Sequence, residues 1–146
     1  MAEAQQYVVE FVPRDVEADL VAGLAPFGVE AASEVTEDRV PGMVRVSRTG
    51  GALRHQQTRD GPEVLVETWG EDAVEAFDIA QRVWAVFRTW EIRGFITPGV
   101  VVHDMDLDVP RTRDDELAPE LHRCQFVASF TTDLTEIELT EEATNG

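Results

Sequence analysis

The most constraining part of this chain lies between residues 43 and 90, where two strand patterns, a glycine-rich loop and an apolar helix pattern occur together. Within residues 43–48, Val44 and Val46 alternate with Arg45 and Ser47, as in a half-buried strand. A loop over residues 49–62 then leads into a second strand pattern at residues 63–69. This order predicts a pair of antiparallel strands with a long projecting hairpin loop, followed directly by a helix.

The helix pattern over residues 71–90 carries apolar side chains at spacings of three and four. Such a stripe covers a sheet far more often than it binds a cofactor, because a packed helix must bury a face about 100° wide. Its members are Ala73, Phe77, Ala80, Trp84 and Phe87, flanked by Ala76, Val83 and Trp90. We expect this to be the main core helix and to have no chemical role.

Weaker patterns mark the other elements. A first helix is expected over residues 15–25, with its buried stripe at Val16, Leu20 and Leu24. A strand or extended arm is expected over residues 7–12, and further strands over residues 100–108 and 121–132. The expected core faces of these last two strands are Val101, His103, Met105 and Leu107, and His122, Cys124, Phe126, Ala128 and Phe130. The sequence therefore predicts an α/β fold of the α+β kind, with a small, mostly antiparallel sheet of about four strands packed by two helices.

The length and composition fit one domain, since 146 residues with 43% hydrophobic content suffice for a single core. We place this domain at residues 1–132 and an acidic C-terminal tail at residues 133–146. Its composition favours a mobile tail, although alternating Leu134, Ile137 and Leu139 leave open that it docks on a neighbour. No stretch approaches the roughly 20 apolar residues of a membrane helix, and the start lacks a signal-peptide pattern. We therefore expect a soluble protein, made in the cytoplasm, with no membrane partner.

The charge is strongly acidic, because 29 acidic residues face 12 basic ones and give a net charge of −17. All twelve basic residues are arginines, which fits a GC-rich genome, and the excess of acids would suit a halophilic host. Phosphate binding requires clustered positive charge. We therefore expect no sequence-specific binding of nucleic acid.

One run departs from this acidity, because residues 39–59 contain five arginines and a histidine but no acidic residue. Complementary charge on identical copies could join such a run to an acidic face of the next copy. The candidate subunit-interface residues are Arg45, Arg48, Arg54, His55 and Arg59. A flexible hairpin with solvated arginines and a DNA-facing channel are the alternatives for the same residues.

Two other groups of polar residues could carry chemistry. Asp104, Asp106 and Asp108 alternate along one strand and could grip a divalent cation, but they also suit a solvated face. His122 and Cys124 share a strand face, yet no orienting group, oxyanion site or known catalytic motif accompanies them. We expect no enzyme activity, no metal and no cofactor.

The order of elements resembles that of the lambda-type tail terminator proteins of long-tailed, siphovirus-like viruses. The resemblance covers about residues 14–132 and rests on the Val-Arg-Val strand with its following glycines at residues 44–51, the helix beginning at residues 73–80, and the late strand pair. The extended segment at residues 7–12 and the acidic tail depart from the family pattern.

The resemblance implies a structural protein of the virion, at the junction of tail and neck. Its copies would form a six-membered ring on the head-proximal end of the tail tube, stop polymerisation of the tube protein and offer a surface to the neck. DNA would pass through an acidic lumen without being retained. A head-tail connector of the neck, or a small acidic adaptor domain from outside any virus, is the alternative function.

Overall fold

The computed structural model describes residues 5–35 and 38–142, which form two helices and eight strands. Two strands and a helix open the chain, and a hairpin with the long second helix forms its centre. The elements are β1 (Gln5–Val12), α1 (Val16–Leu24), the 3-10 turn η1 (Ala25–Phe27), β2 (Ala31–Ala32), β3 (Val44–Arg54), β4 (Arg59–Gly70), α2 (Ala73–Arg93), β5 (Val102–Leu107), β6 (Arg111–Thr112), β7 (His122–Asp133) and β8 (Thr135–Glu142).

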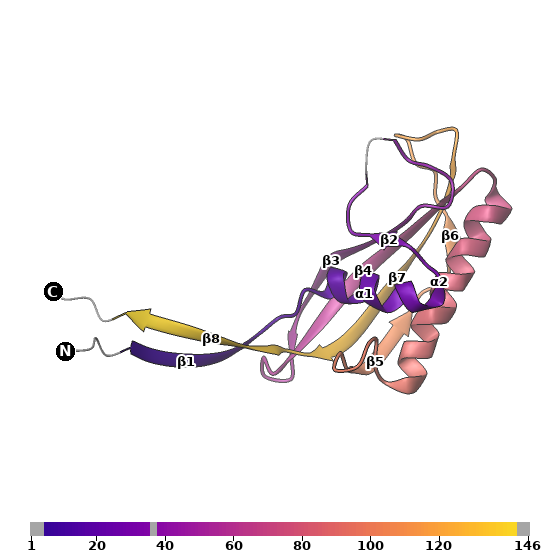
Figure 1. The fold of residues 1–146 in the computed structure, drawn as a ribbon. Helices are drawn as coiled ribbons and strands as arrows, with labels where there is room; N and C mark the ends of the chain where they lie inside the picture. The colour runs from indigo at the N-terminus through magenta and orange to yellow at the C-terminus, as the bar shows by residue number, and fades with distance from the viewer. Residues whose placement is uncertain (1–4, 36–37, 143–146) are drawn as a thin grey trace.

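The main sheet has the strand order β2-β3-β4-β7-β5, and the short β6 also pairs with β7 (Figure 1). All pairs are antiparallel except β2 with β3. The register places Val46 beside Val66 and Val66 beside Phe126, so apolar side chains of three neighbouring strands share one face. The predicted α+β class and antiparallel sheet are confirmed.

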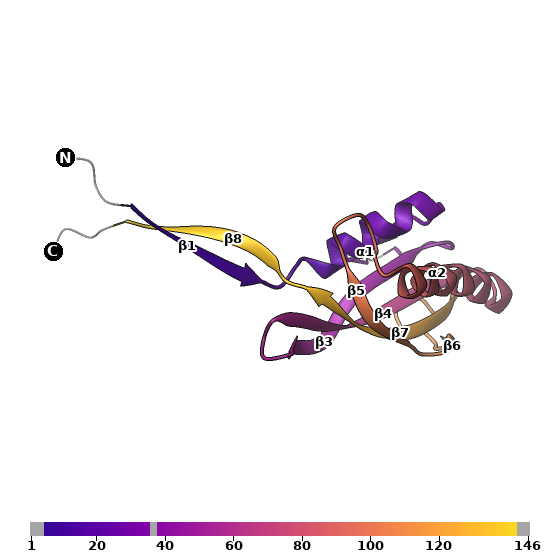
Figure 2. The same cartoon turned by 90° about the horizontal axis from the view of Figure 1, so that it is seen from below.

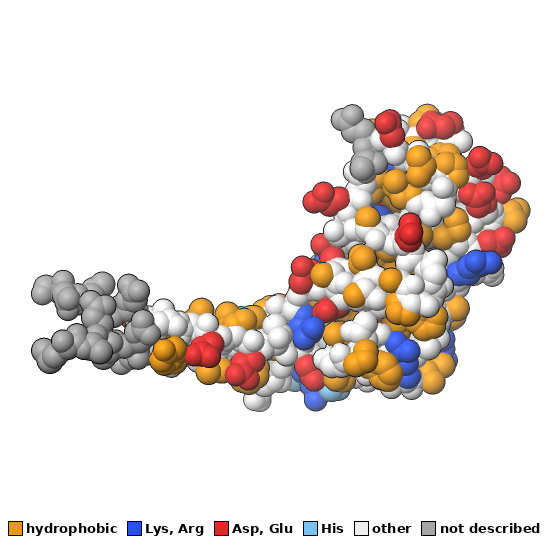
Figure 3. Space-filling model, viewed as in Figure 1, with side chains coloured by type: hydrophobic (Ala, Val, Ile, Leu, Met, Phe, Trp, Pro, Cys, Tyr) orange, Lys and Arg blue, Asp and Glu red, His pale blue; other side chains and the backbone are white. Residues whose placement is uncertain are grey.

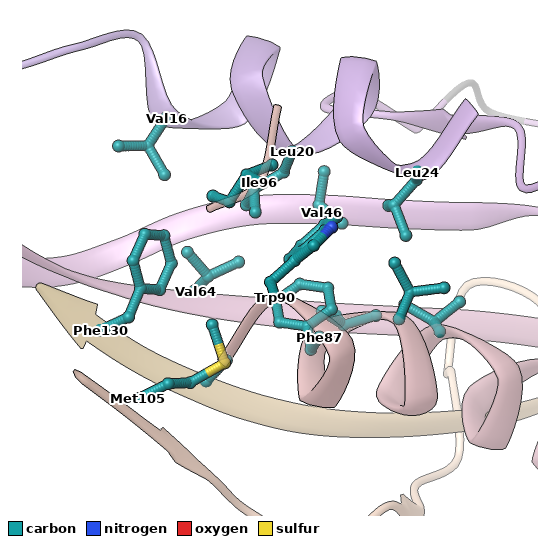
Figure 4. Close-up of a cluster of buried hydrophobic side chains, with 14 of the residues drawn as sticks. Val16, Leu20, Leu24, Val46, Val64, Phe87, Trp90, Ile96, Met105 and Phe130 are labelled. Atoms are coloured by element: carbon teal, nitrogen blue, oxygen red, sulfur yellow. The ribbon is translucent and has the colours of Figure 1, made fainter. Parts of the chain in front are cut away.

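Both helices pack on that same face and enclose a single main core (Figure 4). Phe87 and Trp90 of α2 lie at its centre, with ring centroids 4.6 Å apart, and Phe87 meets Phe126 of β7 edge to face at 5.5 Å. Helix α1 approaches closely because Gly23 has no side chain there: a Cβ would lie 2.9 Å from the Trp90 ring and 2.4 Å from Ile96. Among the described residues, no helix covers the opposite face of the sheet (Figure 2).

The helix ends follow local chemistry. Asp15 and Asp72 cap α1 and α2, their carboxylates accepting hydrogen bonds from backbone N–H groups three residues on. Gly94 ends α2 in the left-handed conformation at φ 82°, which glycine adopts without steric cost. Ala73 and Phe77 are wrongly assigned to the core stripe, because both are exposed. The buried face of α2 consists of Ala76, Ala80, Val83, Val86, Phe87 and Trp90.

The predicted loop at residues 49–62 is mostly strand. β3 continues to Arg54 and β4 resumes at Arg59, so only residues 55–58 form the turn of a projecting hairpin. Its glycines signal close packing rather than a loop: Gly51 has φ 92°, and a Cβ on it would lie 2.0 Å from the Gly61 carbonyl oxygen. The hairpin is therefore a paired structure, irregular in register only between Arg48 and Gly50.

Strand β5 differs from its predicted alternation because its pairing with β7 shifts between Val102 and Asp104. The shift buries Val102 and Met105 and leaves His103 exposed, so the predicted core face is wrong for His103. In β7 the prediction holds for Cys124, Phe126, Ala128 and Phe130, which are buried, but His122 is exposed.

Residues 135–142 are not the mobile tail that their composition suggested. They form β8, which pairs along its whole length with β1, from Gln5 beside Glu142 to Val12 beside Thr135. The rest of the predicted tail, residues 143–146, lies outside the described residues. None of the helices in the described part of the chain combines the length and apolar character needed to cross a membrane.

Candidate assembly interface

The β1–β8 ribbon, made of Gln5–Val12 and Thr135–Glu142, projects away from the domain (Figures 1 and 2). It forms a separate two-stranded sheet, and neither of its strands pairs with the main sheet. An isolated two-stranded ribbon is at best marginally stable in water. The ribbon is therefore the strongest candidate for a partner surface.

Both faces of the ribbon expose apolar side chains, and those turned to the viewer are visible in Figure 3. One face carries Tyr7, Val9 and Phe11 of β1, which are 51–63% exposed, opposite Thr140, Glu138 and Glu136 of β8. The other face groups Val8, Val12, Ile137 and Leu139 with Glu10. Apolar surface on both faces distinguishes this ribbon from a solvated hairpin, which would keep one polar face.

The ribbon is also uniformly acidic. Its two strands contain five glutamates, Glu10, Glu136, Glu138, Glu141 and Glu142, and no basic residue. A partner surface must therefore offer both apolar contact and positive charge.

The five arginine-run candidates divide into three groups. Arg45 lies on the helix-free face of the sheet, where its Nε donates a 2.7 Å hydrogen bond to Glu67. Arg123 of β7 donates to the other carboxylate oxygen of Glu67 at 3.1 Å. Glu67 is only 1% exposed, so this cluster spans three strands and satisfies a buried carboxylate from both sides.

Arg48 lies on the opposite face, beside helix α1. It donates to the fully buried carboxylate of Asp60 at 2.8 Å and to the carbonyl oxygen of Gly50 at 3.0 Å. The hydrogen bond to Asp60 is the main cause that raises the pKa of Arg48. Arg45 and Arg48 thus stabilise the fold internally, although both keep about a quarter of their side-chain surface exposed.

The remaining candidates lie at the hairpin end. Arg59 approaches Asp133 at 3.8 Å, and both side chains are 40% exposed or more. Arg54 and His55 are exposed, and neither side chain makes a hydrogen bond or ion pair with any described residue. His55, Gln56 and Gln57 all have φ between 53° and 66°, a left-handed run that costs non-glycine residues conformational energy. Arg54, His55 and Arg59 are therefore the candidates that remain open to a partner.

The three aspartates on β5 and the residue after it do not converge. Asp104 accepts a 2.9 Å hydrogen bond from the Thr131 hydroxyl, whereas Asp108 accepts from the backbone N–H of Val109. No group of three or more potential metal ligands occurs among residues 5–35 and 38–142.

The remaining titratable candidates are also separated. The Cys124 thiol is buried, and burial raises its pKa, which disfavours the nucleophilic thiolate. His122 is exposed on the same strand, and His103 contacts Asp133 at 2.6 Å near the start of the ribbon. This arrangement provides no activated nucleophile.

Sequence reasoning missed two features. Asp115, in the acidic loop, is buried at the far end of the sheet, where it accepts a 3.0 Å hydrogen bond from Trp69 Nε1 and lies 2.7 Å from Arg39. Burial alone would raise the pKa of Asp115, but the donors Trp69 and Leu117 and the charge of Arg39 together lower it. The second missed feature is a small apolar hollow outside the core, lined by Phe77, Gln81, Trp84, Val109 and Pro110.

Comparison with models of known protein families found no match, and no curated protein sequence matched this chain.

Proposed function

We propose that this protein is a structural subunit of a viral tail, a terminator that forms a closed ring on the head-proximal end of the tail tube. The observation that carries the assembly role is the β1–β8 ribbon, which exposes Tyr7, Val9 and Phe11 on one face and Ile137 and Leu139 on the other. Burying these side chains against another subunit would stabilise the assembly by roughly 25 cal/mol for each Å² of apolar surface removed from water.

The viral role rests on the resemblance of the strand, hairpin and helix order to tail terminators. Two further features support it. The net charge of −17 suits a conduit that must not retain the passing genome. The projecting hairpin and the ribbon give a subunit two different surfaces, as a head-to-tail ring requires.

The ring would act by binding alone and would catalyse no reaction. One face would bind the last ring of tube protein and block further addition, and the other would bind the neck connector. The mature location would be the virion, at the tail-neck junction, after assembly in the host cytoplasm. No cofactor takes part in this mechanism.

The test is electron microscopy of particles made by a virus from which this gene is deleted. Overlong, uncapped tubes beside tailless heads are expected. Complementation with the wild-type gene should restore normal tails, whereas a gene carrying both Phe11→Asp and Ile137→Asp should not. Ile92→Asp provides the matched control, because Ile92 is 75% exposed on α2 and lies outside the ribbon.

Other outcomes would overturn the terminator role. Finished tails of normal length beside leaking or unjoined heads would identify a neck connector instead. Unaffected virions would favour an adaptor role outside the virus particle.

A further inference from the structure

We propose that the β1–β8 ribbon of one copy docks along the β3–β4 hairpin of a second copy and extends its sheet at the open edge of β3. The inference rests on the proposed ring and names the two surfaces that would join its subunits.

The main sheet has two edge strands that could accept another strand. β2 covers β3 only at Val44 and Arg45, so among the described residues no strand pairs with this edge from Val46 to Arg54. The Glu17 carboxylate accepts a hydrogen bond from the backbone N–H of Arg48 on this edge. The remainder of the edge is a template for main-chain pairing with a partner strand. The second edge is β5, at the other side of the sheet.

Charge distinguishes the two edges. β5 and the residue after it carry Asp104, Asp106 and Asp108, which would repel the five glutamates of the ribbon. The hairpin end carries Arg54, His55 and Arg59, and its one acid, Asp60, is buried against Arg48. The β3 edge is therefore the electrostatically favourable site for an acidic ribbon.

The hairpin also offers apolar surface. Leu53 is 39% exposed and stands on the edge strand itself, beside the exposed Ala52. Ala52 and Leu53 point to opposite faces of the strand, so Leu53 would contact the apolar side chains of one face of the docked ribbon and Ala52 those of the other, while the glutamates reach the arginines. Main-chain pairing would supply affinity, and the charges would fix the choice of edge.

This contact joins two different surfaces of one chain, so it is heterologous and can repeat from copy to copy until a ring closes. Each strand of the ribbon has eight residues and spans about 26 Å, enough to reach across a neighbour's hairpin. Ribbon and hairpin leave the domain at the same end, where Arg59, beside the hairpin turn, lies 3.8 Å from Asp133 at the base of the ribbon (Figure 1).

The experiment measures the mass of the purified full-length chain by size-exclusion chromatography with light scattering, at low and high salt. Wild type should form an oligomer. A ribbon variant, Phe11→Asp with Ile137→Asp, and a hairpin variant, Arg54→Glu with Arg59→Glu, should each fall to the mass of one chain. The control Arg82→Glu reverses an exposed arginine on α2 and should leave the oligomer unchanged.

Mixing the two defective variants gives the decisive result. The intact ribbon of the hairpin variant should dock on the intact hairpin of the ribbon variant, and the mixture should form a dimer and nothing larger. Thr140→Cys in the hairpin variant and Ala52→Cys in the ribbon variant should then form a disulfide cross-link between the two chains. Leu117→Cys in the ribbon variant, in place of Ala52→Cys, should not. Unchanged circular dichroism would show that each variant folds.

An oligomer that survives the hairpin reversal, a mixture that stays monomeric or a monomeric wild type would overturn this inference. Failure of the proposed function is separable from that. If the mixture dimerises but gene deletion leaves tail length normal, the docking surface stands and the terminator role fails. A wild-type dimer in which each ribbon covers the partner's hairpin would likewise support the surface and reject the ring.

Discussion

The substitution Glu67→Gln tests whether the three-strand cluster stabilises the fold. It keeps the size of a side chain that is 1% exposed but removes the charge shared by Arg45 and Arg123. Hydrogen bonds to a charged group are worth about 1.5–3 kcal/mol, against about 1 kcal/mol for neutral pairs. Because each arginine is 21–29% exposed and partly solvated, we take the lower part of that range for each bond. Each of the two arginines then loses about 1 kcal/mol, the difference between a charged and a neutral hydrogen bond. The expected loss is about 2 kcal/mol in the free energy of unfolding.

Urea unfolding followed by tryptophan fluorescence provides the assay. A loss of this size should lower the midpoint by about 1 M urea for a domain of this length. The measurements should be made in the Phe11→Asp, Ile137→Asp background, so that oligomer formation does not add to the apparent stability. The loss should persist at high salt, since buried pairs are screened less than exposed ones.

Glu63→Gln is the matched control, because Glu63 lies on the same strand and face but is exposed. It should change the unfolding free energy by less than about 0.5 kcal/mol. Equal effects of the two substitutions would refute the reasoning, as would a Glu67→Gln protein that is as stable as its parent.

Three further substitutions test other parts of the fold. Asp115→Asn should destabilise the protein at neutral pH, as measured by urea unfolding curves from pH 6 to 3. Because the folded state lowers the pKa of Asp115 below 3.8, the difference in unfolding free energy from wild type should shrink as pH falls through and below that value. A constant difference would disprove the ionic contribution. Gln57→Gly should raise the unfolding free energy by up to about 1 kcal/mol by relieving a left-handed φ of 66°, whereas Thr58→Gly, after that run, should not. Phe87→Ala should cost about 3–5 kcal/mol through the cavity it leaves beside Trp90 and Phe126, and a midpoint near that of wild type in thermal unfolding would contradict the packing described for the core.

The helices were predictable because their signals are local. Asp72 caps α2, Gly94 ends it, and the apolar spacing between them marks its buried face within one turn. Its exact face was not predictable, because Phe77 and Ala76 compete for the core and only the packing of the sheet decides between them.

The hairpin and the ribbon depend on contacts between distant residues. Gly50, Gly51 and Gly61 suggested a loop, yet the turn uses three left-handed residues without glycine, against their local preference. β8 pairs with β1, which lies at the other end of the sequence, so its alternation of Ile137 and Leu139 could not reveal a partner.

The interface candidates show the same limit. The run at residues 39–59 lacks acids in sequence, but Glu67 and Asp60 from the neighbouring strand neutralise Arg45 and Arg48. The pattern of residues within one strand does not show which charged side chains the neighbouring strand places beside it. Arg54, His55 and Arg59, at the end of the hairpin, keep exposed side-chain surface, and their role in an interface stays a prediction.

The direct connection between β7 and β8 has a mechanical consequence. Only Leu134 separates the two strands, and β7 lies between β4 and β5 in the sheet. Ladder hydrogen bonds run across the strands, so a pull along β8 would load many of them at once in shear rather than one after another. Tension on the ribbon would thus pass through β8 into β7, the most heavily paired strand of the domain. Tension on β1 would pass to α1 through the short segment at residues 13–15. A subunit held by its ribbon would therefore resist extraction until the hydrogen bonds of its central sheet broke.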